Sequence, residues 1–441
     1  MLDKPLYIAS YHQSKFGKLK EMQLPEMIRH AVEGACSEVG VEPAAIDVGS
    51  IGAACGFTLN RQGLLAGLMA MVPGLEGKPI EAVENACASG GQAVLSVAHK
   101  LLLGLGDVGV AVGVEKMRDE HGKMDGKLVG EVLGFFSHPE EREGKVFVFP
   151  HLFAEVMEQY MKAYGVSEED LARIAVTEYA SARHNPYAQM KNVEVSLEQA
   201  MAIEGINRYV APGLPLKTYD CSQITDGYAA LLLATEEGLF RLGVAKADAV
   251  RLAGFAQATD PILKEGRNVL EPAGAYRAMD AAYRMAGATP EDVNVAEIHD
   301  CFTVMGAIGV EVLRKAKPGE GARYWKECRT RSECAVNHSG GLIAKGHPIG
   351  ATGVAMVGWC AWQMMGKAPE ALQVEAPRVA ATFNIGGPIC ASVCTTRIRS
   401  ASSAGARPAS HASASSVFPC LPITTAARNW ASRRWRPVVT D

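Results

Sequence analysis

The fold is best predicted from one stretch of the sequence, Ile80-Glu81-Ala82-Val83-Glu84-Asn85-Ala86-Cys87-Ala88-Ser89-Gly90-Gly91. Its first six residues are typical of a short strand, and a cysteine follows just before two glycines. Residues 93–103 are apolar on nearly every face, which is typical of a buried helix. Residues 107–114, rich in valine and glycine, predict the next strand. A strand, a buried helix and a strand in this order indicate a layered α/β protein.

The second half of the chain repeats this order of elements. Residues 295–298 and 379–384 predict strands, and residues 350–365 predict a helix nearly without a polar face. We therefore predict an α/β fold of two similar halves, residues 1–245 and 246–398. The buried helices of the two halves would lie back to back.

Residues 116–216 interrupt the first half with a different composition. They carry more charge, and residues 153–164 and 168–182 have the pattern of amphipathic helices. We interpret this segment as a loop and helical insertion, and we expect it to lie over the first sheet.

The composition is that of a soluble globular protein. Of the 441 residues, 48% are apolar and 21% are charged, and the formal net charge is −4. No overall positive charge favours nucleic acid or a membrane surface, and the apolar runs are too short to cross a bilayer. Eleven cysteines are scattered singly, which fits reduced thiols better than a disulfide framework. Met1–Pro5 lacks the start of a secretion signal, so we expect a cytoplasmic protein.

Cys87 is the first candidate catalytic residue. A thiol between a strand end and a helix start lies in the field of the helix dipole, so we expect its pKa to be lowered. The neighbouring glycines would let a substrate carbonyl approach the backbone, where the Cys87 N–H can donate to an oxyanion. A buried cysteine at a packed helix start would give the same pattern.

A second motif surrounds His347. Residues 344–353 read Ala-Lys-Gly-His-Pro-Ile-Gly-Ala-Thr-Gly, so the imidazole is held between glycine and proline. A fixed imidazole beside a thiol is the arrangement that activates a nucleophilic cysteine. No Gly-Lys-Ser or Gly-Lys-Thr sequence follows, which argues against a phosphate-binding loop.

Two further motifs end predicted strands. His299-Asp300-Cys301-Phe302 places His and Cys two residues apart, but no third ligand is suitably spaced, so we predict no metal site. Cys301 could instead carry a proton, as thiols do where their pKa is tuned. In Asn384-Ile385-Gly386-Gly387-Pro388, the Gly386 N–H is a candidate oxyanion donor.

In this order the four motifs resemble the thiolase superfamily, and within it the sterol-carrier-protein type of thiolase, over residues 5–396. Cys87 matches the acyl-accepting cysteine, and Gly346-His347-Pro348 matches the activating histidine loop. The His-Asp-Cys-Phe loop stands where other thiolases have Asn-Glu-Ala-Phe, and Asn384 stands where they have an acid/base cysteine. In the sterol-carrier type, the cysteine of that loop, here Cys301, takes the acid/base role.

The resemblance implies the thiolase fold, a five-layer α-β-α-β-α sandwich, and acyl transfer to and from coenzyme A. It implies that Cys87, activated by His347, attacks a 3-oxoacyl-CoA, that Cys301 protonates the enolate, and that free CoA then cleaves the thioester. One oxyanion site is implied near His299 and His347, and another at the N–H groups of Cys87 and Gly386. CoA enters as a substrate, and no cofactor is bound permanently.

The resemblance also implies ligands and partners. His151 lies where family members have a histidine at the thioester end of CoA, and a structural role within the insertion is the alternative. We expect a homodimer or homotetramer, with residues 108–114 close to the contact. Some bacterial members work with a small zinc-ribbon and OB-fold subunit.

Three other functions stay open at this point. Cys87 argues against a retro-aldol carbon–carbon lyase, whose relatives lack this nucleophile. The His-Asp-Cys-Phe and Gly-His-Pro loops favour a thiolase over a condensing enzyme that takes acyl groups from a carrier protein. A non-catalytic acyl-CoA binding subunit would have no chemical reason to keep Cys87, Cys301 and His347.

Residues 399–441 differ in composition from the rest of the chain. They hold nine Ala, eight Ser and six Arg, no Lys or Glu, and one acid, so residues 1–398 carry a formal charge of −9. We expect this tail to be a disordered extension or the product of a frame-shifted gene end, and its removal to leave activity intact. Six Arg without Lys or periodic aromatics give little support to a nucleic-acid arm.

Overall fold

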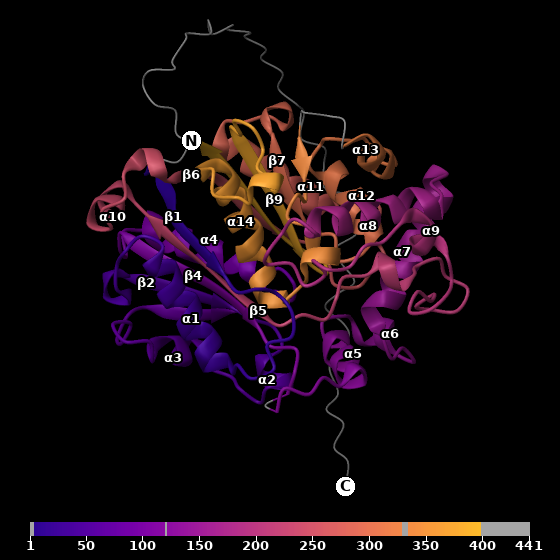
Figure 1. The fold of residues 1–441 in the computed structure, drawn as a ribbon, viewed down its shortest axis with the longest axis horizontal. Helices are drawn as coiled ribbons and strands as arrows, with labels where there is room; N and C mark the ends of the chain where they lie inside the picture. The colour runs from indigo at the N-terminus through magenta and orange to yellow at the C-terminus, as the bar shows by residue number, and fades with distance from the viewer. Residues whose placement is uncertain (1–3, 120, 329–333, 398–441) are drawn as a thin grey trace, which may run out of the picture. The chain divides into compact units, whose positions relative to one another are not determined.

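Ten strands form one mixed sheet within the part of the chain that the structure describes (Figure 1). The computed structural model describes residues 4–119, 121–328 and 334–397. The strands are β1 Leu6–Gln13, β2 Val48–Gly52, β3 Ile80–Val83, β4 Val108–Glu115, β5 Gly227–Ala234, β6 Val250–Thr259, β7 Val295–Ile298, β8 Ala335–Val336, β9 Val379–Gly386 and β10 Ile389–Arg397. Their order across the sheet is β3-β2-β4-β5-β1-β6-β10-β9-β7-β8.

The first five strands and the last five have the same pairing pattern. In each set, the second strand lies parallel to the third and fourth, and the fifth lies antiparallel to the fourth and first. Antiparallel pairing of β1 with β6, at Leu6–Ile8, joins the two sets. The pattern matches the two similar halves expected from the sequence, and the boundary between residues 245 and 246 stays a prediction.

Two apolar helices separate the half-sheets, as predicted. Helices α4, Ser89–Leu102, and α14, Ile349–Met365, pack on each other and on strands of both halves (Figure 1). Helix α1, Leu24–Ser37, covers β1, β4 and β5, and helix α11, Ala273–Ala286, covers β6 and β10. These layers form the five-layer α/β sandwich.

Strand β5 has apolar side chains on both of its faces, so each face of its five-strand set needs a layer of helices to cover it. Leu231 and Leu233 pack in the cluster that contains the central helices, whereas Leu232 packs in the cluster that contains α1. Successive side chains of a strand point to opposite faces, so a strand apolar at every position is buried on both.

Helix α4 begins four residues earlier than predicted because its glycines lie against α14. A Cβ on Gly90 would lie 2.5 Å from the Gly350 oxygen, and one on Gly353 would lie 2.1 Å from the Gly91 nitrogen. The two central helices therefore touch through their main chains.

The insertion consists of five helices: α5 Gly126–Gly134, α6 Pro139–Arg142, α7 Val148–Tyr164, α8 Glu168–Ala182 and α9 Leu197–Met201. The expectation that it lies over the first sheet is wrong. Helices α7 and α8 pack on α12, Thr303–Val312, which belongs to the second half. Every residue of α12 is buried, so this apolar helix needs cover on all sides, and the apolar faces of α7 and α8 supply it.

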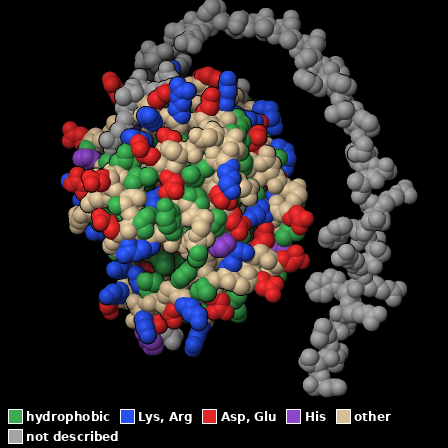
Figure 2. All heavy atoms as spheres, turned by 90° about the vertical axis from the view of Figure 1, so that its right-hand side faces the viewer, with side chains coloured by type: hydrophobic (Ala, Val, Ile, Leu, Met, Phe, Trp, Pro, Cys, Tyr) green, Lys and Arg blue, Asp and Glu red, His purple; other side chains and the backbone are tan. Residues whose placement is uncertain are grey.

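The remaining described helices are α2 Gly56–Leu59, α3 Leu65–Ala70, α10 Glu236–Arg241 and α13 Gly321–Cys328. No described helix is both long and apolar enough to cross a membrane. The face seen in Figure 2, on the side of α7 and α9, carries acidic and basic side chains interspersed among apolar ones. The predicted tail, residues 399–441, lies outside the described residues.

Candidate active site

Three predicted catalytic residues converge from three loops. Cys87 lies between β3 and α4, His299 follows β7, and His347 precedes α14. The Cys87 sulfur and one ring nitrogen of each histidine lie within 4.8 Å of one another. The two imidazole rings meet edge to face, with centroids 5.0 Å apart and planes at 89°. Together with Cys301 they line a cavity of about 950 Å³.

The roof of this cavity comes from the insertion. Phe136, Phe147, Phe149 and Phe153 line it, and they lie in or beside α5 and α7. Residues 221–224, just before β5, complete the wall. The insertion therefore encloses the reacting groups and limits their contact with water.

Asn384 on β9 fixes the proton of His299. The Gly91 N–H donates to the Asn384 Oδ1 over 3.3 Å, so the amide nitrogen faces the other way. That nitrogen lies 3.0 Å from the Cys87 oxygen and 3.0 Å from the His299 Nδ1. Because an amide NH₂ only donates, the His299 Nδ1 must accept, and a neutral ring then carries its proton on Nε2. This Nε2 has no partner among the described residues, so it is a donor available to a substrate.

His347 has the opposite tautomer. Its Nδ1 lies 2.7 Å from the Thr352 hydroxyl, and that hydroxyl donates its own proton to the Pro348 oxygen over 3.0 Å. The Nδ1 must therefore be the donor of its pair, which leaves Nε2 as a free acceptor. The Thr225 hydroxyl accepts the His347 backbone N–H over 3.0 Å and holds the loop. One histidine thus offers a proton and the other can take one.

The thiol of Cys87 is protonated at rest, contrary to the expected lowering of its pKa. Burial raises the pKa of Cys87 to about 12, and the nearby carboxylates Glu115 and Glu84 add to the effect. These effects outweigh that of the helix dipole at the start of α4. Burial lowers the pKa of His347 to about 3. The resting pair is a neutral thiol and a neutral imidazole, so this thiol can become a nucleophile only by giving up its proton.

Cys301 and Asp300 have separate roles in their motif. Burial raises the pKa of the Cys301 thiol well above its usual value, so it holds a proton inside the cavity. The Asp300 carboxylate accepts the backbone N–H groups of Leu342, at 2.8 Å, and Ile343, at 3.3 Å. Asp300 thereby anchors the π-helical turn Gly341–Lys345 that leads to His347. The sequence analysis missed this anchoring role, and that of Asn384.

Gly386 lies against the Cys87 turn. A Cβ at this position would be 2.0 Å from the Asn85 oxygen and 3.0 Å from the Cys87 nitrogen, so only glycine fits. The close approach places its backbone beside that of Cys87, and its part in an oxyanion site stays a prediction.

His151 lies in the first turn of α7. Its Nε2 is 3.2 Å from the Glu155 Oε1, and its neighbours Phe149 and Pro150 line the cavity while His151 itself does not. Its predicted contact with CoA stays a prediction.

Cys87, His299 and His347 are also the one cluster of described residues with the spacing of a metal site. A metal ion at this point would need a lone pair on the Nε2 of His299. Donation from Asn384 to the Nδ1 places the proton on that Nε2 instead. The arrangement therefore favours hydrogen bonding over metal ligation.

Comparison with known proteins covers nearly all of the described chain. The families "Thiolase, N-terminal domain" and "Thiolase C-terminal domain-like" match residues 6–237 and 256–397. An acetyl-CoA acetyltransferase of Methanothermobacter thermautotrophicus is 35% identical over 379 residues, which cover 85% of this chain and 94% of the relative. The benzoylsuccinyl-CoA thiolase subunit BbsB of Thauera aromatica is 30% identical, covering 88% and 96%. Human sterol carrier protein 2 is 28% identical, covering 86% and 70%.

Two solved structures share the fold. The Ltp2-ChsH2(DUF35) aldolase superposes with a TM-score of 0.73 at 20% identity, covering 90% of this chain and 99% of that one. Human mitochondrial 3-ketoacyl-CoA thiolase in complex with CoA superposes with a TM-score of 0.66 at 17% identity, covering 90% and 99%.

Proposed function

The chain belongs to the thiolase family, and we propose that it transfers acyl groups to CoA through a thioester on Cys87. One observation carries the assignment of roles. A single cavity holds the thiols of Cys87 and Cys301, a histidine that can only donate and a histidine that can only accept. These are the groups that a reaction with two developing oxyanions and two proton transfers requires.

Attack on the substrate is the first step. The Cys87 sulfur bonds to the 3-keto carbon of a 3-oxoacyl-CoA while its proton passes to the Nε2 of His347. The N–H groups of Cys87 and Gly386 stabilise the resulting alkoxide. No backbone acceptor is recorded for the Cys87 N–H in the described chain, which fits this use.

Cleavage of the C2–C3 bond is the second step. The alkoxide reforms a carbonyl, now a thioester on Cys87, and the electron pair moves into an enolate on the departing acyl-CoA. The His299 Nε2–H and the protonated His347 donate to the enolate oxygen, and the Cys301 thiol protonates C2.

Transfer to CoA closes the cycle. The Cys301 thiolate takes the proton of the CoA thiol, and the CoA sulfur attacks the Cys87 thioester. Cys87 leaves as a thiolate and recovers its proton from His347. Every group then returns to its resting state, and the reverse sequence condenses two acyl-CoAs.

The substrate and setting follow from the relatives. Similarity to an acetyl-CoA acetyltransferase supports acetoacetyl-CoA as the simplest substrate, with His151 near the CoA thioester. We propose a cytoplasmic homodimer or homotetramer. Residues 108–114, expected close to the contact, form β4, which is paired on both sides, whereas β3 is the outer strand of the described sheet and leaves an edge for such a contact. A fold neighbour solved with a DUF35 protein and a relative named as a subunit support a zinc-ribbon and OB-fold partner.

The requirement for free CoA tests the proposal. Purified protein with acetoacetyl-CoA should consume substrate only when CoA is added, and mass spectrometry without CoA should find an acetyl group on Cys87. The aldolase among the fold neighbours gives the alternative outcome. Cleavage of a 3-hydroxyacyl-CoA without added CoA, and no acyl group on Cys87, would make the protein a lyase.

A further inference from the structure

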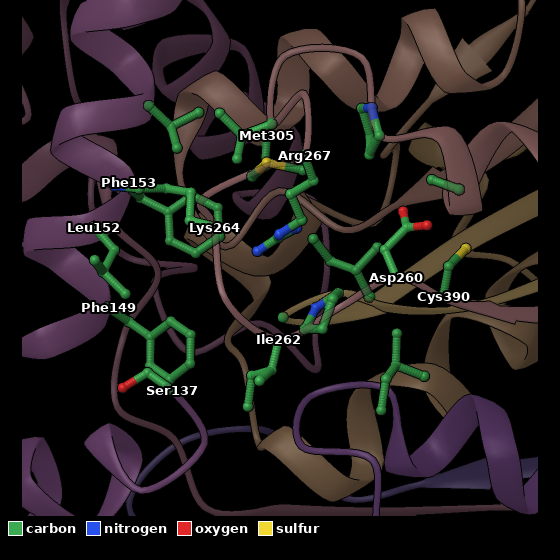
Figure 3. A pocket seen from close by; sticks show the side chains of 18 of the residues that line it. Ser137, Phe149, Leu152, Phe153, Asp260, Ile262, Lys264, Arg267, Met305 and Cys390 are labelled. Carbon is green, nitrogen blue, oxygen red and sulfur yellow. The ribbon is translucent and has the colours of Figure 1, made fainter. Parts of the chain in front are cut away.

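A second cavity adjoins the catalytic one (Figure 3). It has a volume of about 830 Å³, and Phe136, Phe149, Phe153 and Ile385 line both cavities. The shared lining residues place this space directly beside the cavity that holds Cys87. The proposed reaction uses none of the residues found only in the second cavity.

Most of its lining is apolar. Helix α7, the start of α11 and the β9–β10 hairpin contribute side chains such as Leu152, Val156 and Phe383. Such walls suit the methylene groups of an acyl chain. They do not suit the hydroxyl and phosphate groups of the CoA nucleotide, which would lose hydrogen bonds to water there.

Four charged residues interrupt this apolar lining, and three of them are already engaged. Asp260 accepts the Gly274 N–H at 2.8 Å and pairs with Arg277 at 2.9 Å. The Lys264 ammonium pairs with Glu155. Glu141 accepts the Lys264 backbone N–H at 2.7 Å.

Arg267 is the exception. Its Nε donates to the Leu263 oxygen at 3.3 Å, and no described residue forms a hydrogen bond or ion pair with its two Nη groups. The carboxylates of Glu141 and Asp260 lie near enough to favour its charge, but neither is bonded to it. In Figure 3 its guanidinium extends into the middle of the cavity, near Lys264 and Phe153. A guanidinium keeps its charge in proteins, and the fork of two Nη groups matches a carboxylate.

We propose that this cavity binds the acyl part of the substrate and that Arg267 binds a carboxylate at its far end. The substrate class is then a 3-oxoacyl-CoA whose chain ends in a carboxylate. The inference rests on the proposed thiolase function and narrows it. The apolar walls hold the chain, and a charge-assisted pair with Arg267 fixes its end.

Matched substrates test this inference in the full-length enzyme. A carboxylate-terminated 3-oxoacyl-CoA should be cleaved with a higher kcat/KM than its own methyl ester, which has nearly the same shape. Arg267→Met should lower kcat/KM for the carboxylate about tenfold or more, and leave the values for the ester and for acetoacetyl-CoA within about twofold.

Three further variants sharpen the result. Glu141→Gln removes a negative charge from the same cavity and should raise the preference for the carboxylate substrate. Arg29→Met removes an exposed arginine of α1 and should change neither preference. Arg267→Lys keeps the charge but loses the fork, so it should recover only part of the loss.

Failure of this inference and failure of the proposed function would give different kinetic results. If Arg267→Met raises the KM for CoA equally with every substrate, Arg267 binds a phosphate of CoA and the inference is wrong. Equal loss on carboxylate, ester and acetoacetyl-CoA would also overturn it. If the wild type cleaves no 3-oxoacyl-CoA at all, including acetoacetyl-CoA, the proposed function itself fails.

Discussion

Cys87 and His347 occupy equivalent places in the two halves. Each lies in the loop that leads from the third strand of its half-sheet to a central helix, from β3 to α4 and from β8 to α14. The first loop needs only five residues, 84–88. The second is longer and contains the turn Gly341–Lys345. The buried carboxylate of Asp300, which follows β7, accepts hydrogen bonds from this turn and holds it in place.

The two loops differ because the two halves contribute different groups to the candidate active site. In the proposed reaction, the first half contributes one reacting group, the Cys87 thiol that takes the acyl group. The second half contributes His299, Cys301 and His347, to which the proposal assigns protons and charge, and Asn384, which orients His299. The similar architecture of the two halves thus brings both loops to one cavity, and the sequence of each loop determines which reacting groups it contributes.

Replacing the Cys87 thiol, the proposed attachment site of the acyl group, should have the largest effect on the rate. Cys87→Ser should lower the thiolysis rate by at least about 10³-fold, because a serine hydroxyl beside a weakly basic imidazole is a poorer nucleophile. The measurement is CoA-dependent cleavage of acetoacetyl-CoA. Near-normal cleavage by this variant would place the acyl group elsewhere and break the comparison of the halves.

Removing the second thiol should separate the two half-reactions. Cys301→Ala should still form the acyl-enzyme, while exchange of the C2 proton of acetyl-CoA with deuterated water falls by about 10²-fold or more. Mass spectrometry follows the acyl group, and NMR follows the exchange. Normal exchange would assign the proton to another residue.

Changing one atom of Asn384 should reverse the tautomer of His299. In Asn384→Asp a carboxylate oxygen replaces the NH₂ donor, so the His299 Nδ1 should carry the proton and the Nε2 should lose it. Loss of this oxyanion donor should lower kcat about 10²-fold.

The imidazole nitrogen shifts in an NMR spectrum report the tautomer directly. Asn207→Asp is the matched control, because Asn207 is a buried amide of the insertion that donates to the Ala200 oxygen. It should leave the His299 tautomer unchanged. An unchanged tautomer in Asn384→Asp would remove this positioning role.

The raised pKa of Cys87 predicts a smaller and continuous effect. A thiol with a pKa of about 12 is mostly neutral below that pH, so the thiolate fraction should grow about tenfold with each pH unit. The rate of Cys87 alkylation by iodoacetamide should rise in this way from neutral to alkaline pH. A plateau that begins near neutral pH would show that the helix dipole dominates after all.

Much of the fold could be predicted because its elements are buried in regular patterns. The predicted helix 168–182 and the predicted strand 295–298 have the same bounds in the structure. The position of the insertion could not be predicted. An amphipathic pattern shows that a helix has an apolar face, but it does not show that α12, far along the chain, is what that face covers.

The candidate active site, like the fold, could be predicted from the sequence only in part. Local motifs identified Cys87, His299, Cys301 and His347, and the structure brings all four to one cavity. The pKa of Cys87 is raised mainly by burial and further by Glu115, which is distant in sequence, and neither effect can be predicted from the local helix start. The hydrogen bonds of Asn384 to two separate segments, residues 87–91 and His299, have no signature in a single motif.

The main-chain contact between α4 and α14 has a consequence for how this protein can change. The spacing of nucleophile and base is set where Gly90 meets Gly350 and Gly353, so no side chain can be exchanged there to retune it. The lining of the second cavity, by contrast, is built from ordinary side chains of the insertion and the loop around Arg267. If the second cavity binds the acyl group as proposed, new acyl groups can be accommodated by substitution in that lining, while the spacing of Cys87 and His347 stays fixed.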